Sequence, residues 1–177
     1  MVKPVILVVG AIPVIFAILI AIPMLTQKEI PFSATNPNDM IEFEYTKHQL
    51  RQVSFGVTER VAAEKSEILS IKNNGEVKYT VLENGITKPD KISKLDENKI
   101  TKLTALIKET GFMSIPSESF PINENVTEYQ KSSLKITLNG KENQIYWPEQ
   151  NATEKFVPPI ITMVEAELDQ IISQLID

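Results

Sequence analysis

Hydrophobic residues along this chain form one long run, several short alternations with polar residues, and two helical stripes. The run extends from Pro4 to Leu25 and contains no charged side chain. As a helix of roughly 22 residues it would rise about 33 Å, which is enough to cross a hydrocarbon core of about 30 Å. We therefore predict a transmembrane anchor over residues 1–26.

The charges around this run predict its orientation. Lys3 and the α-amine precede it, whereas Lys28 beyond it is followed at once by Glu29 and then by further acidic residues. The positive-inside rule then places the N-terminus in the cytoplasm. The expected localisation is the cell membrane, with a single pass and the C-terminal domain outside.

A cleaved signal peptide is the alternative for this segment. Signal peptides usually have an apolar region of about 7–15 residues that ends in an A-x-A-like site. The run here is longer and continues as Pro-Met-Leu-Thr-Gln without such a site, which favours an anchor. Pro13 in mid-span removes one helix hydrogen bond and predicts a kink. The span is thus either a simple tether or a helix that docks against other membrane subunits.

Residues 27–47 are predicted to form a stalk or extended arm. The segment is polar at first and is broken by Pro31 and Pro37, which are turn and linker signals. Further along, Ile41, Phe43 and Tyr45 alternate with polar residues, as in a half-buried strand or an arm packed on the domain.

Residues 48–177 are predicted to form one α+β domain. Apolar and polar residues alternate in short segments that predict strands with one apolar face, at 53–57, 69–71, 77–81, 134–138 and 145–147. Asn74-Gly75 and Asn139-Gly140 predict tight antiparallel hairpins, and Asn84-Gly85 ends a strand. Gly56, in the middle of the first segment, is expected to form a bulge. Residues 111–133 are predicted to be a long connection that is either an ordered loop or an interaction site.

Two amphipathic helices complete the domain. Asp96 is a good N-cap for the first, whose apolar stripe is Ile100, Leu103, Leu106 and Ile107 and whose end is marked by Gly111. The second follows Pro158-Pro159, with a stripe formed by Ile161, Val164, Leu168, Ile171, Ile172 and Leu175. Hairpin turns and two helical stripes together predict a two-layer sandwich, in which both helices cover one face of an antiparallel sheet.

Composition excludes several classes of function. Acidic residues outnumber basic ones by 23 to 18, which argues against nucleic acid as the main partner. The chain has no cysteine, so disulfides, a thiol nucleophile and an iron–sulfur site are excluded. The glycines beyond the span are already assigned to turns, a cap or the bulge, and no phosphate-binding glycine motif is present, which argues against nucleotide binding of those types.

Few residues are candidates for chemistry. His48 is the only histidine, and without partners nearby it is predicted to be solvent-exposed. With one histidine and no cysteine, any metal would have to be a hard cation held by carboxylates. The sequence Ser132-Ser133-Leu134-Lys135 matches the S-x-x-K pattern of serine acyl-enzymes. We reject that assignment because the flanking alternation predicts a strand, in which positions i and i+3 point to opposite faces.

Acidic and aromatic side chains near the C-terminus offer two further candidates. Glu165, Glu167 and Asp169 all fall on the last helix, and Glu165 and Asp169 share one face of it. These two carboxylates would hold Ca²⁺ or serve as an acid/base pair, although a solvated helix face is the favoured interpretation. Trp147 and Tyr146 would form a ligand platform, but a core position for Trp147 is favoured. No catalytic, cofactor-binding or metal-binding residue is therefore assigned.

Two N-x-S/T sequences begin at Asn125 and Asn151, both in predicted loops. Loop placement of such acceptor sequences suits an extracytoplasmic domain.

The hairpin from Asn74 to Tyr79, the helix from Ile100 to Phe112, and the Asn139-Gly140 hairpin that leads to Trp147 and a terminal helix together carry a resemblance. The chain resembles small, single-span, extracytoplasmic α+β proteins of ammonia-oxidising archaea. The resemblance implies the same membrane topology and transfers no catalytic residue. Some single-span proteins of those organisms are accessory subunits of membrane enzymes, including the copper-dependent monooxygenase.

The expected function is a non-enzymatic, membrane-anchored binding or assembly module on the extracytoplasmic side, with a protein partner in the membrane or envelope. The alternatives are an accessory subunit of a membrane enzyme complex, and a secreted or surface domain that binds envelope polymer. A hydrolase that uses carboxylates is the remaining hypothesis, and it requires two acidic residues that converge in a deep cleft.

Overall fold

A computed structural model of the chain describes residues 35–56 and 58–176. The strands are β1 (Ile41–Phe55), β2 (Thr58–Ile71), β3 (Glu76–Glu83), β4 (Ile86–Thr87), β5 (Lys91–Lys94), β6 (Glu128–Leu138) and β7 (Lys141–Pro148). The helices are α2 (Glu97–Glu109) and α3 (Pro159–Ile176), with short 3₁₀ turns η2 (Phe112–Ser114) and η3 (Gln150–Ala152). The predicted anchor and residues 27–34 of the predicted stalk lie outside the described residues.

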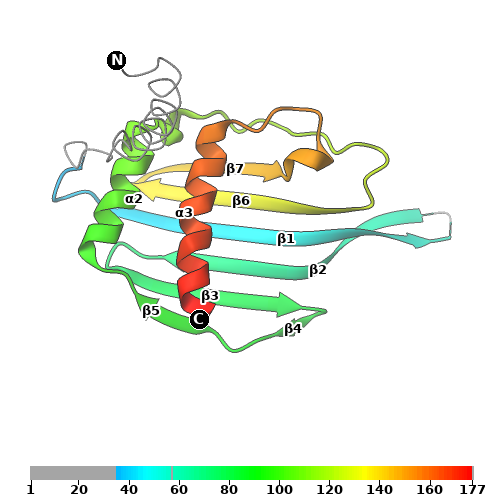
Figure 1. The fold of residues 1–177 in the computed structure, drawn as a ribbon, viewed down its shortest axis with the longest axis horizontal. Coiled ribbons are helices and arrows are strands. Elements are labelled where there is room, and N and C mark those ends of the chain that lie inside the picture. The colour runs from blue at the N-terminus through cyan, green and yellow to red at the C-terminus, as the bar shows by residue number, and fades with distance from the viewer. Residues whose placement is uncertain (1–34, 57, 177) are drawn as a thin grey trace, which may run out of the picture. The chain divides into compact units, whose positions relative to one another are not determined.

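Within the described residues the strands form one seven-stranded antiparallel sheet in the order β4-β3-β2-β1-β6-β7, and β5 also pairs with β3. Both helices lie on the same side of this sheet, with α3 crossing the strands and α2 near one end of them (Figure 1). The α+β class and the two-layer arrangement are confirmed. None of the helices described is both long enough and apolar enough to span a membrane.

Alternation along the strands separates a core face from an open face. The core side of β1, β6 and β7 contributes Phe43, Leu134 and Ile145, each of which is fully buried. Leu106 and Ile107 of α2, together with Val164 and Leu168 of α3, cover this side. Burial of these apolar side chains is the main source of stability for such a two-layer domain.

The predicted turns and caps agree with the structure. Asn139 and Gly140 both have positive φ, of 51° and 79°, in a two-residue turn between paired residues of β6 and β7, as a primed hairpin turn requires. Asp96 caps α2 by accepting a hydrogen bond from the Lys99 amide at 2.7 Å, and Gly111 follows in the left-handed conformation with φ of 66°.

The structure moves residues 41–47 from the predicted arm into the domain. They are the first half of β1, which pairs with β2 on one side and β6 on the other. Ile41 and Tyr45 are each only 1% exposed, so the half-buried strand was the better interpretation of this alternation. The prediction failed because prolines before the strand resembled a linker that continued to residue 47.

The expected bulge at Gly56 is wrong. Gly56 lies at the tip of the β1–β2 hairpin with φ of 74°, immediately after Phe55, which pairs with Thr58. The register shift falls instead after Gln49, where Glu64 is the extra residue of β2. The connection predicted for residues 111–133 is also shorter than expected, because η2 begins at Phe112 and β6 at Glu128.

Candidate functional site

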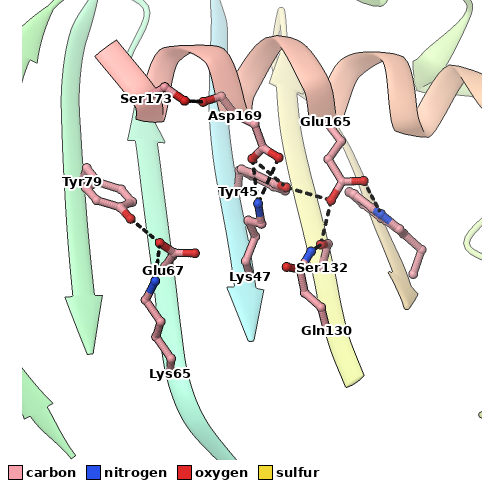
Figure 2. A network of polar contacts seen from close by, with 11 residues as sticks. Tyr45, Lys47, Lys65, Glu67, Tyr79, Gln130, Ser132, Glu165, Asp169 and Ser173 are labelled. Atoms are coloured by element: carbon pink, nitrogen blue, oxygen red, sulfur yellow. Dashed lines mark hydrogen bonds and ion pairs between the residues drawn. The ribbon is translucent and has the colours of Figure 1, made fainter. Parts of the chain in front are cut away.

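The most concentrated chemistry of the described chain lies between α3 and the sheet. We call it the α3 cluster, and its members are Tyr45, Lys47, Ser132, Trp147, Glu165 and Asp169. Pairing across β1, β6 and β7 places Lys47 beside Ser132 and Ser132 beside Trp147 on the core face. Glu165 and Asp169 are one helical turn apart on α3, and both side chains point toward this row (Figure 2).

Glu165 accepts hydrogen bonds from three strands. Its Oε1 accepts the hydroxyl protons of Tyr45 and Ser132, both at 2.9 Å, and its Oε2 accepts the indole N–H of Trp147 at 3.0 Å. The three donor residues are 1–2% exposed. A carboxylate bound by neutral donors in this way ties the middle of α3 to β1, β6 and β7 at once.

Asp169 is held by a cation. The Lys47 ammonium lies 2.9 Å from both carboxylate oxygens, and the Tyr45 hydroxyl lies 3.3 Å from Oδ1. The Lys47 side chain is 17% exposed and that of Asp169 is 38% exposed. The pair is therefore partly shielded from water, where an ion pair is screened less than at the surface.

Tyr45 is kept protonated by its surroundings. Burial first, and then the negative charges of Glu165 and Asp169, raise the pKa of Tyr45 well above its usual range. Its ring also stacks against Trp147, with centroids 6.4 Å apart and an interplanar angle of 13°. Tyr45 is thus a permanent donor to the two carboxylates at neutral pH.

A second carboxylate lies on the neighbouring strand. The Tyr79 hydroxyl and the Lys65 ammonium both donate to Glu67 (Figure 2). Burial by itself would raise the pKa of Glu67, but these hydrogen bonds outweigh it and hold the pKa below its usual range. Burial, together with Glu67, raises the pKa of Tyr79 above its usual range. Glu67 faces Lys47 across the β1–β2 pairing, so ionic and hydroxyl groups follow one another across the sheet.

In the part of the chain that is described, every buried side-chain polar atom has a hydrogen-bond partner. The hydrogen bonds of Glu165 and Asp169 therefore fix the position of α3 on the sheet. The favoured prediction of a solvated helix face is wrong for these two residues, whereas Glu167 is exposed as expected. Sequence periodicity could not distinguish a carboxylate that contacts the sheet from one that faces solvent, because the strand residues that face α3 lie more than 100 positions away or on a different hairpin.

A small cavity of about 220 Å³ adjoins the cluster. Glu165, Ser132 and Trp147 form one part of its wall, and Gln130 and Glu149 are among the residues that complete it. Glu149 and Glu165 both line this cavity, but it is small compared with typical ligand pockets of about 300–1,000 Å³. A second, more open hollow of about 860 Å³ is lined by Asp39, Asp96 and Glu97 among others.

The remaining candidates are dispersed. Ser132 points to Glu165, whereas Lys135 pairs with Glu142 at 3.2 Å on the opposite face of the sheet, which confirms that strand geometry separates the S-x-x-K residues. His48 is half-buried on the open face, and its Nδ1 lies 2.8 Å from the Ser66 hydroxyl oxygen. The prediction of a solvent-exposed histidine is therefore incorrect.

Burial, with a smaller contribution from the positive charge of Lys131, holds the pKa of His48 below its usual range. Trp147 is 2% exposed, as predicted for a core residue, and Tyr146 points to the open face. No group of three or more His, Cys, Asp or Glu suited to a metal ion occurs within residues 35–56 and 58–176.

No protein-family model matches the chain, and no curated protein is significantly similar to it.

Proposed function

We propose that this chain is a membrane-anchored binding or assembly module that docks a protein partner on the extracytoplasmic side, without chemistry of its own. The segment 4–25 serves as the anchor in this proposal, with the N-terminus in the cytoplasm. The α3 cluster serves to hold the two layers together. Binding then falls to the face of the sheet that the helices do not cover.

The observation that carries the proposal is an uncharged row across this open face. Pairing of five adjacent strands places Tyr146, Ser133, Thr46, Ile68 and Thr80 side by side. We call these residues the open row. With strands about 4.8 Å apart, the row is about 19 Å wide. Tyr146 is 44% exposed and Ile68 is 41% exposed.

Charged residues of both signs border the open row. This mixed charge favours a protein as the binding partner over a polyanion or a neutral surface. Lys135 pairs with Glu142, and Lys78 pairs with Asp90 at 2.9 Å, so both signs are present at the margin. An uncharged centre with an exposed tyrosine, surrounded by a rim of mixed charge, is the usual anatomy of a protein interface. Because the row belongs to a paired antiparallel sheet, it is presented on a rigid backbone.

Single-cysteine crosslinking tests this proposal, because the chain has no native cysteine. The full chain carrying Ile68→Cys is expressed in its native membranes and treated with a thiol-to-amine crosslinker. The matched control is Met163→Cys on α3, since Met163 is 44% exposed but lies on the opposite layer. We expect a defined heteromeric adduct from Ile68→Cys and none from the control.

Two outcomes contradict separate parts of the proposal. Equal crosslinking of both variants, or none from Ile68→Cys, rules out the open row as the docking face. A membrane-impermeant thiol reagent applied to intact cells tests the topology with the Met163→Cys control. Labelling only after lysis would place the domain inside the cell and refute the extracytoplasmic assignment.

A further inference from the structure

The described chain contains two potential N-glycosylation sequences that look equivalent in the sequence but differ in the fold. They are Asn125-Val126-Thr127 and Asn151-Ala152-Thr153. Both asparagines are exposed, so access to the acceptor side chain does not distinguish them. We propose that Asn125 is a glycan acceptor in the folded protein and that Asn151 is not. The inference rests on the extracytoplasmic location given under the proposed function.

The hydroxyl residues of the two sequences separate them first. Thr127 is exposed, and its side chain makes no hydrogen bond with the residues that the structure describes. Thr153 is only 3% exposed, and its hydroxyl oxygen already accepts the Lys155 amide at 3.3 Å. A glycosyltransferase that reads both the asparagine and the threonine can therefore reach the pair at 125–127 but not the pair at 151–153.

The local structure around the two asparagines also differs. Asn125 lies in a turn closed by the Val126 amide and the Asn123 carbonyl at 3.0 Å, at the end of the connection before β6. Asn151 is the middle residue of η3, and its neighbour Ala152 is fully buried.

Ala152 is also fixed in the backbone of the domain. Its N–H donates to Glu149 and its carbonyl accepts from Asn123, at 3.0 Å and 2.9 Å. Extending residues 151–153 into an enzyme cleft would break these bonds and expose the buried side chains of Ala152 and Thr153. Residues 125–127 also make two backbone hydrogen bonds, from the Val126 amide to the Asn123 carbonyl and from the Gln52 amide to the Thr127 carbonyl, but opening that turn exposes no fully buried side chain.

The chemistry requires a sugar donor of the lipid-linked oligosaccharyl diphosphate class. The Asn125 side-chain nitrogen would form a bond to the anomeric carbon, while the bond from that carbon to the diphosphate oxygen breaks. The electron pair stays on the leaving diphosphate, and the amide nitrogen gives one proton to a base of the transferase. No oxidation or reduction takes place.

The test expresses the full chain in a host with a protein N-glycosylation pathway and measures the intact mass and the mobility shift on enzymatic deglycosylation. We expect one glycan per chain, which is lost in Asn125→Gln and in Thr127→Ala and is retained in Asn151→Gln. Asn125 and Thr127 are exposed, so these two substitutions leave the core intact. Circular dichroism of each variant checks this.

An engineered acceptor sequence distinguishes an error in the choice of Asn125 from an error in the extracytoplasmic location. Ser117→Asn creates a third acceptor sequence that ends at Ser119, and residues 117–119 are all exposed. A glycan on this engineered site without one on Asn125, or a glycan on Asn151, overturns the inference and leaves the extracytoplasmic location intact. If neither the engineered site nor Asn125 is modified, both the inference and the location are refuted.

Discussion

Removing the carboxylate of Glu165 tests the structural role that we assign to the α3 cluster. Glu165→Met keeps a side chain of similar length but removes the acceptor of three hydrogen bonds. The Trp147 indole N–H would then have no partner, and the Ser132 hydroxyl would lose its acceptor. Tyr45 retains its contact with Asp169 at 3.3 Å.

The expected loss of unfolding free energy in Glu165→Met follows from those contacts. A buried donor left without a partner costs about 1–3 kcal/mol, and a rotatable hydroxyl costs less because it can turn to another acceptor. Glu165→Met should therefore lower the free energy of unfolding by about 2–4 kcal/mol. At about 3 °C per kcal/mol for a domain of this size, the melting temperature falls by roughly 6–12 °C. Glu165→Gln should recover at least half of the loss, because its amide offers both an acceptor and a donor.

The assay is denaturant unfolding of the full chain in mild detergent, followed by far-ultraviolet circular dichroism. Combining Glu165→Met with Trp147→Phe completes a double-mutant cycle. We expect a coupling of about 1.5–3 kcal/mol, the usual contribution of a hydrogen bond to a charged group. Glu167→Met, on the exposed side of the same helix, is the matched control and should stay within about 0.5 kcal/mol of the parent chain.

If Glu165→Met is no more destabilising than Glu167→Met, Glu165 does not hold α3 on the sheet. A coupling below about 0.5 kcal/mol would refute it more specifically, because the indole and the carboxylate would then contribute independently of each other.

Three further predictions concern pH, turn geometry and strand orientation. Asp39→Asn should flatten the loss of stability between about pH 4 and pH 2. Hydrogen bonds, led by the one from Lys108, lower the pKa of Asp39 in the folded protein to about 2. The ionised Asp39 therefore stabilises the fold above its unfolded pKa, and this stabilisation disappears as the pH falls through its folded pKa. Gly75→Ala should cost at least about 1 kcal/mol more than Gly140→Ala, because both residues have positive φ but only at Gly75 would a Cβ lie 2.7 Å from a backbone oxygen. Ser132→Ala should cost about 1 kcal/mol of stability through its lost hydrogen bond.

Each of these predictions has its own check. Acid titration of unfolding stability compares Asp39→Asn with the parent chain, and equal slopes below pH 4 would exclude the proposed linkage. Thermal melts compare the two glycine variants, and equal losses would mean that the approach to the Leu95 carbonyl is relaxed without cost. For Ser132→Ala the control is Lys135→Ala, whose side chain points to the other face, and a larger loss from the lysine variant would contradict the strand orientation.

Local signals in the sequence were sufficient for both helices and for the hairpins at Asn74-Gly75 and Asn139-Gly140, but they did not predict β4, β5 or residues 58–68 of β2. Asn139-Gly140 specified its hairpin because asparagine and glycine tolerate positive φ, and Asp96 and Gly111 marked the ends of α2 for similar local reasons. Alternation predicted an apolar face for the strand around Leu134 and for its partner around Ile145, and the hairpin turns together with the two helical stripes predicted the two-layer α+β class. Such features depend on residues within a few positions of one another.

Gly56 and residues 41–47 show where local signals were insufficient. A glycine among alternating residues fits a bulge or a turn equally well until the partner strand is known. Likewise, prolines before Ile41 do not reveal that the next strand lies at the centre of the sheet. The order of the strands depends on which strands pair edge to edge so that all their apolar faces cover one core, and that depends on the whole chain.

The roles of Glu165 and Asp169 were decided by the tertiary structure alone. Their spacing on α3 determined that they share a face, but the sequence could not show that Tyr45, Ser132 and Trp147 would be their donors. Those residues lie on three strands and meet only when the sheet forms. The sequence by itself determined the two helices, the hairpin turns, the acidic composition and the apolar run that we propose as an anchor. The fold determined which polar residues hold the layers together and which face of the sheet stays open, because both depend on contacts between segments far apart in the chain.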